Sequence, residues 1–172
     1  MPASQHIDVF NGLEIFAEPT KKPDPVFFTD QAPEFEVTLR NNDAKYEWSE
    51  DSSIRWTIET GKGDIIHTDK VEFGPLDNGE ETTIMAGGEI LAYEGHGVFG
   101  VATGSASSTS TNRRRLKAGR ERNTDPVYSY SVWDRSHYNA SVQWPKRLQI
   151  GLIVTSIVLI LFAVVQIGLV IA

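Results

Sequence analysis

The chain has 172 residues, no cysteine and a formal net charge of −7 at neutral pH. Because cysteine is absent, disulfides, thiolate metal sites and cysteine nucleophiles are all excluded. The negative charge argues against a general nucleic-acid-binding protein, since such proteins usually present a positive field. We therefore do not expect nucleic acid to be a partner of this chain.

The region between residues 6 and 103 predicts a set of short β-strands. Apolar and polar residues alternate with a period of two, and Gly, Pro, Asn and Asp interrupt each run. The expected strands are 13–17, 35–39, 54–58, 65–73, 81–85, 90–93 and 98–102, with a last strand at 127–133. Short strands at this spacing favour two packed antiparallel sheets, and a barrel is the alternative. Residues 1–134 are therefore expected to form an all-β domain.

Four segments of this domain share a pattern of core and turn residues. They are Leu39-Arg40-Asn41-Asn42 at a strand end, the aromatic strand around Trp56, the turn Leu76-x-x-Gly79-Glu80 leading to Ile84, and Gly97-Val98-Phe99-Gly100-Val101. The pattern resembles the immunoglobulin-like modules of the CARDB kind, which occur on prokaryotic surface and adhesion proteins. This resemblance covers roughly residues 10 to 134 and implies an immunoglobulin-like antiparallel β-sandwich. It implies no functional site, because the matched positions are core and turn residues.

Residues 104–126 predict a long mobile loop within the domain. The run 104–112 is of low complexity and too poor in apolar residues to build a core. A basic strip, Arg113–Arg122, follows with five Arg, one Lys and one Glu, and thus a net charge of +5. The cations of this basic strip are Arg113, Arg114, Arg115, Lys117, Arg120 and Arg122.

Three roles are open for the basic strip. Near a membrane, it would lie against anionic lipid head groups, at roughly 1 kcal/mol per basic residue. It could equally contact nucleic acid or an acidic partner. The alternative is that the cations keep the loop soluble and pair with the acidic remainder of the chain.

The titratable residues form no recognisable catalytic or metal-binding motif. The histidines are scattered without ligand spacing. Glu94-Gly95-His96-Gly97 brings an acid close to an imidazole, although a turn before a strand explains the glycines more simply. Calcium prefers carboxylate oxygens, but we expect the acids of two loops to be solvated; they are Asp43, Glu47, Glu50 and Asp51, and Asp77, Glu80 and Glu81. The sequence therefore predicts no enzyme activity and no cofactor.

Residues 148–172 predict a transmembrane α-helix. They contain no charged side chain and would extend about 37 Å, against about 30 Å of bilayer hydrocarbon. Residues 135–147 are expected to form a juxtamembrane linker, in which Pro145 separates the domain from the helix. Gly151, Thr155 and Gln166 offer small and polar groups for association between helices. The expected partners are the lipid bilayer and another protein, in a homo- or hetero-oligomer.

Charge beside the helix predicts its orientation. Lys146 and Arg147 immediately precede the span, so the positive-inside rule places the N-terminal domain in the cytoplasm. The first residues lack the basic start and apolar run of an export signal, which is typical of a tail-anchored protein. Against this, Asn139-Ala140-Ser141 is a glycosylation sequon, which would be used only if the domain faced outward.

These observations predict a single-pass protein of the cell membrane. We expect its function to be non-catalytic binding or assembly by a domain on the cytoplasmic face. The alternative is a structural or adhesion protein that presents the same domain outside the cell, with Asn139 available for glycosylation.

Overall fold

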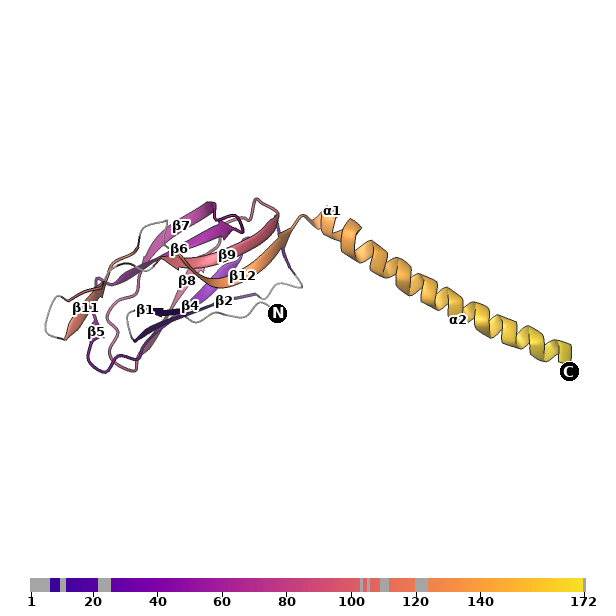
Figure 1. The fold of residues 1–172 in the computed structure, drawn as a ribbon, viewed down its shortest axis with the longest axis horizontal. Coiled ribbons are helices and arrows are strands. Elements are labelled where there is room, and N and C mark those ends of the chain that lie inside the picture. Colours follow the sequence, from indigo (N-terminus) through magenta and orange to yellow (C-terminus); the bar gives the residue numbers. More distant parts are fainter. Residues whose placement is uncertain are drawn as a thin grey trace. The chain divides into compact units, whose positions relative to one another are not determined.

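The computed structural model describes residues 7–9, 12–21, 26–102, 104, 106–108, 112–119 and 124–171. The chain divides into two compact units, Met1–Trp133 and Asp134–Ala172. The first unit is built of β-strands, and the second is helical (Figure 1).

The strands of the first unit form three sheets. A four-stranded sheet has the order β1 (Ile7–Val9), β2 (Leu13–Pro19), β4 (Glu34–Asn41), β8 (Glu81–Gly87). A five-stranded sheet has the order β3 (Phe27–Phe28), β12 (Asp125–Trp133), β9 (Gly95–Ala102), β6 (Ser53–Thr60), β7 (Ile65–Glu72). A small third sheet has the order β10 (Ala106–Ser108), β11 (Arg113–Leu116), β5 (Glu47–Trp48).

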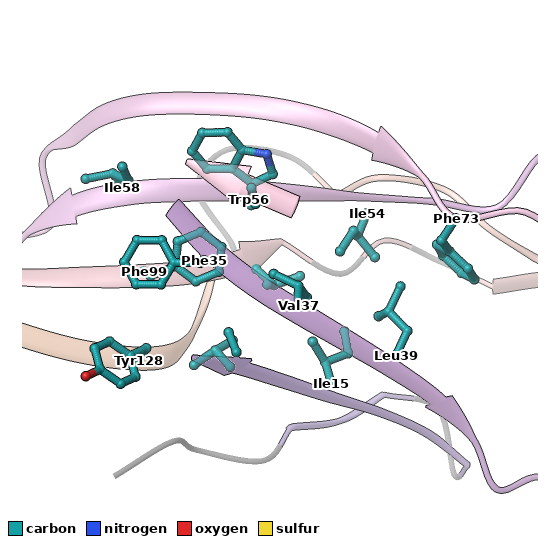
Figure 2. Packing of buried hydrophobic residues seen from close by; sticks show 14 of the residues in the cluster. Ile15, Phe35, Val37, Leu39, Ile54, Trp56, Ile58, Phe73, Phe99 and Tyr128 are labelled. Atoms are coloured by element: carbon teal, nitrogen blue, oxygen red, sulfur yellow. The ribbon is translucent and has the colours of Figure 1, made fainter. Parts of the chain in front are cut away.

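The two larger sheets pack face to face around one hydrophobic core. β4 shows how the sequence builds this core, because Phe35, Val37 and Leu39 are fully buried while the residues between them face away. Phe35 stacks on Phe99 of β9, with ring centroids 4.3 Å apart and ring planes 18° apart. Figure 2 shows these two rings against each other, with Trp56 beside them. The domain is therefore a β-sandwich.

Most of the expected strands are present, and one is not. The β6–β7 hairpin forms in antiparallel register, and Gly79 adopts the positive φ of 82° that the turn before β8 requires. Residues 90–93, expected as a strand, form none. Leu91 instead lies buried in the core, and its N–H donates to the carbonyl of Gln31. A short apolar run in the sequence can be either a strand or a loop that covers the core, because both contain buried residues.

Two further expectations need correction. Residues 104–126 do not form one continuous loop, because β10 and β11 pair within this segment. The sandwich is also not purely antiparallel, since β3 runs parallel to β12 and β5 runs parallel to β11. Both parallel pairs are only two residues long, so they arise where segments distant in sequence meet at a sheet edge.

The second unit is helical from Arg135 onward. It comprises α1 (Arg135–Tyr138), a π-helical turn (Asn139–Gln143) and α2 (Trp144–Ile171), so the expected linker 135–147 is itself helical. Asp134 caps the first turn by accepting hydrogen bonds from the backbone of Ser136 and His137 at 2.8 and 3.1 Å. A hydrogen bond from the Ser136 hydroxyl, together with these two backbone bonds, lowers the pKa of Asp134. The cap is therefore formed at neutral pH and weakens in acid.

Pro145 does not interrupt the helix. It occupies the second position of α2, just after the π-helical turn. In that turn, the N–H of Trp144 donates to the carbonyl of Asn139, five residues earlier. A wide turn accommodates a residue that cannot donate its own backbone hydrogen bond.

We expect Phe35→Ala to lower the free energy of unfolding by about 3–5 kcal/mol, because it removes a fully buried ring from the centre of the sandwich. Urea unfolding of the full chain in detergent micelles, followed by tryptophan fluorescence, measures this change. Phe16→Ala is the matched control, since Phe16 lies on the outer face of β2 and is only half-buried. An equal loss for both variants would contradict a core centred on Phe35.

Candidate functional site

The basic strip is placed by β11, which lies beside β5 at one end of the domain (Figure 1). The N–H of Glu47 donates to the carbonyl of Asn112 at 2.8 Å, and that of Ser49 donates to the carbonyl of Arg114 at 2.7 Å. Leu116 is completely buried and ends the strand. The buried Leu116 and the backbone hydrogen bonds to β5 therefore fix the position of the three consecutive arginines.

Each of these arginines meets a carboxylate from the loop region around β5. Arg113 Nε lies 3.5 Å from Glu47, and Arg115 lies 3.3 Å from Asp51. Both pairs are at least partly exposed, and such pairs contribute little to stability.

Arg114 is held more tightly than its two neighbours. It lies 3.1 Å from Asp43, and the exposed fractions of the two side chains are 20% and 11%. Its guanidinium carbon is 3.4 Å from the ring centroid of Tyr46, a cation–π contact. Because adjacent side chains alternate across a strand, Arg114 points to the same side as the buried Leu116. Its position is thus that of a structural residue.

These pairs agree with one of the roles left open for the basic strip, pairing with the acidic remainder of the chain. Three arginines face three carboxylates, so the charge of this part is locally compensated. Lys117 is exposed and has no acidic partner in the described part of the chain. Arg120 and Arg122 lie outside the described residues. Contact of the basic strip with an anionic surface stays a prediction.

The candidate acid–imidazole pair lies at the surface. Glu94 and His96 are both exposed, just before β9 and within it. A different pair, which the sequence did not suggest, joins His67 of β7 to Glu89 at 3.7 Å, with the imidazole against the ring of Trp56. Among the described residues, no group of three or more His, Asp or Glu is placed to hold a metal ion.

Two tyrosines with raised hydroxyl pKa values have a structural role. The hydroxyls of Tyr93 and Tyr130 lie 3.2 Å apart, and burial raises the pKa of both. Both phenols therefore stay protonated at neutral pH and cannot act as bases. Gly97 allows this arrangement, because a side chain there would collide with the Tyr93 hydroxyl and the Tyr130 ring.

A shallow hollow of about 450 Å³ lies on the outer face of the four-stranded sheet. Its charged lining residues are Glu18, Glu36, Arg40 and Glu81. Glu18 and Glu36 stand directly opposite each other on β2 and β4, an arrangement that costs stability through repulsion. The alternation of apolar and polar residues in Phe16–Glu18 and Glu36–Arg40 predicts which side chains share this outer face. It does not predict that the face is hollowed.

The residues proposed for helix association lie along one side of α2. Gly151, Thr155 and Gln166 are separated by four and eleven residues, which places them within about 60° of one another around the axis. The Thr155 hydroxyl donates to the carbonyl of Gly151 at 2.9 Å, so its own helix satisfies it. Gln166 is exposed and has no partner in the described part of the chain.

The remaining predicted residues lie near the start of α2. Lys146 and Arg147 are in its first turn and are exposed. Asn139 of the sequon begins the π-helical turn and is half-buried. Among the described helices, one is long and apolar enough to cross a membrane, and its apolar stretch is not buried within the protein.

Comparisons with known proteins give structural likeness alone. No protein-family model matches the sequence, and no match was found among curated proteins. The chain is similar to the C-terminal domain of Wzt, with a TM-score of 0.45 and 14% identity, covering 78% of each chain. It is also similar to the CARDB domain of the PF1109 protein from Pyrococcus furiosus, solved in complex with di-metal ions. There the TM-score is 0.40 and the identity 18%, over 73% of this chain and 97% of that one.

A third likeness is to a β-glucosidase from Listeria innocua, with a TM-score of 0.38 and 15% identity. It covers 70% of this chain and 16% of the glucosidase. The expected resemblance to CARDB domains is therefore confirmed as a structural similarity. At these identities and TM-scores, none of the three proteins assigns a site or an activity to this chain.

The Arg114–Asp43 pair should stabilise the domain more than the Arg113–Glu47 pair. In double-mutant cycles with alanine, we expect a coupling energy of about 1–2 kcal/mol for the first pair, which is mostly buried beside Tyr46. The second pair is in solvent and should give about 0.5 kcal/mol or less. Urea unfolding of the full chain measures both. Equal coupling energies would show that burial of Arg114 adds nothing.

Proposed function

We propose that this chain is a single-pass membrane protein whose C-terminal helix anchors a non-catalytic binding or assembly domain on the cytoplasmic face. The observation that carries the proposal is the exposed apolar surface of α2. Large side chains from Leu148 to Leu169 are more than half exposed within the protein. A helix that is apolar on all sides is stable only when lipid or other protein covers it.

The orientation is supported by the charges at the start of α2. Lys146 and Arg147 are exposed in its first turn, and Arg135 begins the helical unit. Basic residues next to a span favour the cytoplasmic side. The same side chains are the first candidates for contact with anionic head groups, with Lys117 of the basic strip as a further one.

An immunoglobulin-like sandwich is supported by the order of the strands. In that fold, the first, second and fifth strands share one sheet, and the third, sixth and seventh share the other. β2, β4 and β8 correspond to the first set, while β6, β9 and β12 correspond to the second. A buried tryptophan on the third strand is another mark of the fold, and Trp56 occupies that place.

The candidate chemical groups of the domain are used within its structure. Three arginines of the basic strip are engaged in ion pairs, and Tyr93 and Tyr130 are hydrogen-bonded to each other. Assembly through the anchor is supported by Gly151, Thr155 and Gln166, which share one side of α2. In hydrocarbon, the amide of Gln166 gains from a partner, at about 0.6–2 kcal/mol.

A second candidate function is a structural or adhesion role outside the cell. The sequon at Asn139 is the observation that favours it, because a glycan would be attached only to an outward-facing domain. The two candidates differ in topology alone, so an experiment on topology decides between them.

Because the chain has no cysteine, a single introduced thiol reports the side on which the domain lies. Asn78→Cys places it in the exposed turn before β8. We expect a membrane-impermeant maleimide to label this variant only after the cells are lysed. Labelling of intact cells, with a cytosolic protein unlabelled as the control for leakage, would establish the outward orientation instead.

The positive flank should set the orientation. We expect the double variant Lys146→Glu, Arg147→Glu, combined with Asn78→Cys, to raise the fraction of chains labelled on intact cells. Lys62→Glu, in the β6–β7 turn, is the matched control and should leave that fraction unchanged. If the double variant behaves like this control, the two residues do not determine topology.

A further inference from the structure

Most open strand edges of the β domain are protected against pairing with another strand. β1 and β3 are only three and two residues long. β7 carries Asp69, Lys70 and Glu72 along its length. β12 contains Pro126 and a bulge between Pro126 and Tyr128. Shortness, charge, proline and bulges are the features by which edges avoid unwanted strands.

β8 is an edge strand without these features. It is seven residues long, and after Glu81 it contains no charge and no proline. Its register with β4 is regular along the whole strand. Thr83 and Met85 are exposed, Met85 to 53%. A long, regular and uncharged edge is the type of surface to which another strand adds.

The free side of β8, which we call the β8 edge, presents unused backbone groups. The N–H of Gly88 donates to the carbonyl of Pro33, and the N–H of Asn41 donates to the carbonyl of Glu80, both at 2.9 Å. Even-numbered residues of β8 are therefore the hydrogen-bonded partners of β4. Since the bonding side alternates along an extended strand, residues 81, 83 and 85 point their N–H and C=O groups the other way, and Gly87, with a φ of 93°, ends the extended run. In the described part of the chain, no strand pairs with that side.

We propose that the β8 edge pairs antiparallel with the β8 edge of a second copy of this chain, in a two-fold dimer centred on Ile84. This register pairs residues 82–86 of the two copies and brings the outward-facing backbone groups of Thr83 and Met85 together across the interface. Glu81 lies opposite Gly87 of the other copy, so no like charges meet. Within its own sheet, Glu81 remains opposite Arg40.

A second copy suits this edge better than an unrelated strand. A two-fold interface uses the same surface on both subunits, and β8 matches itself in length, bonding side and charge. The pairing joins two four-stranded sheets into one continuous sheet and keeps Met85 next to Thr83 of the other copy. The proposal rests on the membrane anchoring proposed above, which confines the copies to one plane and raises their effective concentration.

Disulfide trapping of the full chain in liposomes tests this interface. In the proposed dimer, the Cα atoms of the two Ile84 residues form a non-hydrogen-bonded pair about 4.5 Å apart, a distance that a disulfide can bridge. We expect Ile84→Cys to give a disulfide dimer on mild oxidation. Ile66→Cys on the charged β7 edge, where Ile66 is 41% exposed, is the matched control and should stay monomeric.

Charge on the β8 edge should prevent the dimer. Met85→Lys or Thr83→Lys, each combined with Ile84→Cys, should lower the dimer yield several-fold, whereas Ile66→Lys should not. Unchanged urea midpoints for the lysine variants confirm that they fold. A yield that no lysine on β8 alters, or one that Gln166→Leu alone abolishes, would overturn the proposal. Flotation of the liposomes tests the membrane anchoring separately. If the chain does not float with the liposomes, the proposed anchoring is wrong. The disulfide yields of the same variants in detergent micelles then still decide whether β8 pairs with β8.

Discussion

The apolar surface of α2 is the feature that most limits the environment in which this protein can be stable. Leu159 and Phe162 are 62% and 60% exposed, and removing such a side chain from water is worth about 1.5–3 kcal/mol. The core cluster of the β domain extends from Leu13 to Val132. A helix that is apolar on all sides is stable only where lipid or other protein covers it. A bilayer surrounds a helix on every side, as this surface requires.

The charged residues of the domain serve its structure more than the sequence suggests. Arg114 is fixed by Asp43 and Tyr46, and this contact fastens the small sheet of β5 and β11 to its loop. Arg113 and Arg115 pair with further carboxylates of the same region. Among the described residues, exposed positive charge stands at the start of α2, in Lys146 and Arg147, and at Lys117 of the basic strip.

Strands in which apolar and polar residues alternate were predictable from the sequence alone. The alternation around Phe35 and around Trp56 is visible in the sequence, and the structure confirms both strands. β11 was missed because its residues are polar; it forms through pairing with β10 and through contacts with the distant residues Glu47 and Ser49. The candidate residues of the anchor were predictable from composition. The β8 edge was not, because an edge is defined by the absence of a neighbouring strand, which only the topology reveals.

Alkaline carbonate extraction tests whether α2 anchors this chain in a bilayer. Carbonate removes proteins held at a membrane by charge or by other proteins, whereas an integrated helix stays because its apolar surface remains in hydrocarbon. We predict that the full chain sediments with the extracted membranes. Complete release into the supernatant would contradict this anchoring and would require that another protein covers α2.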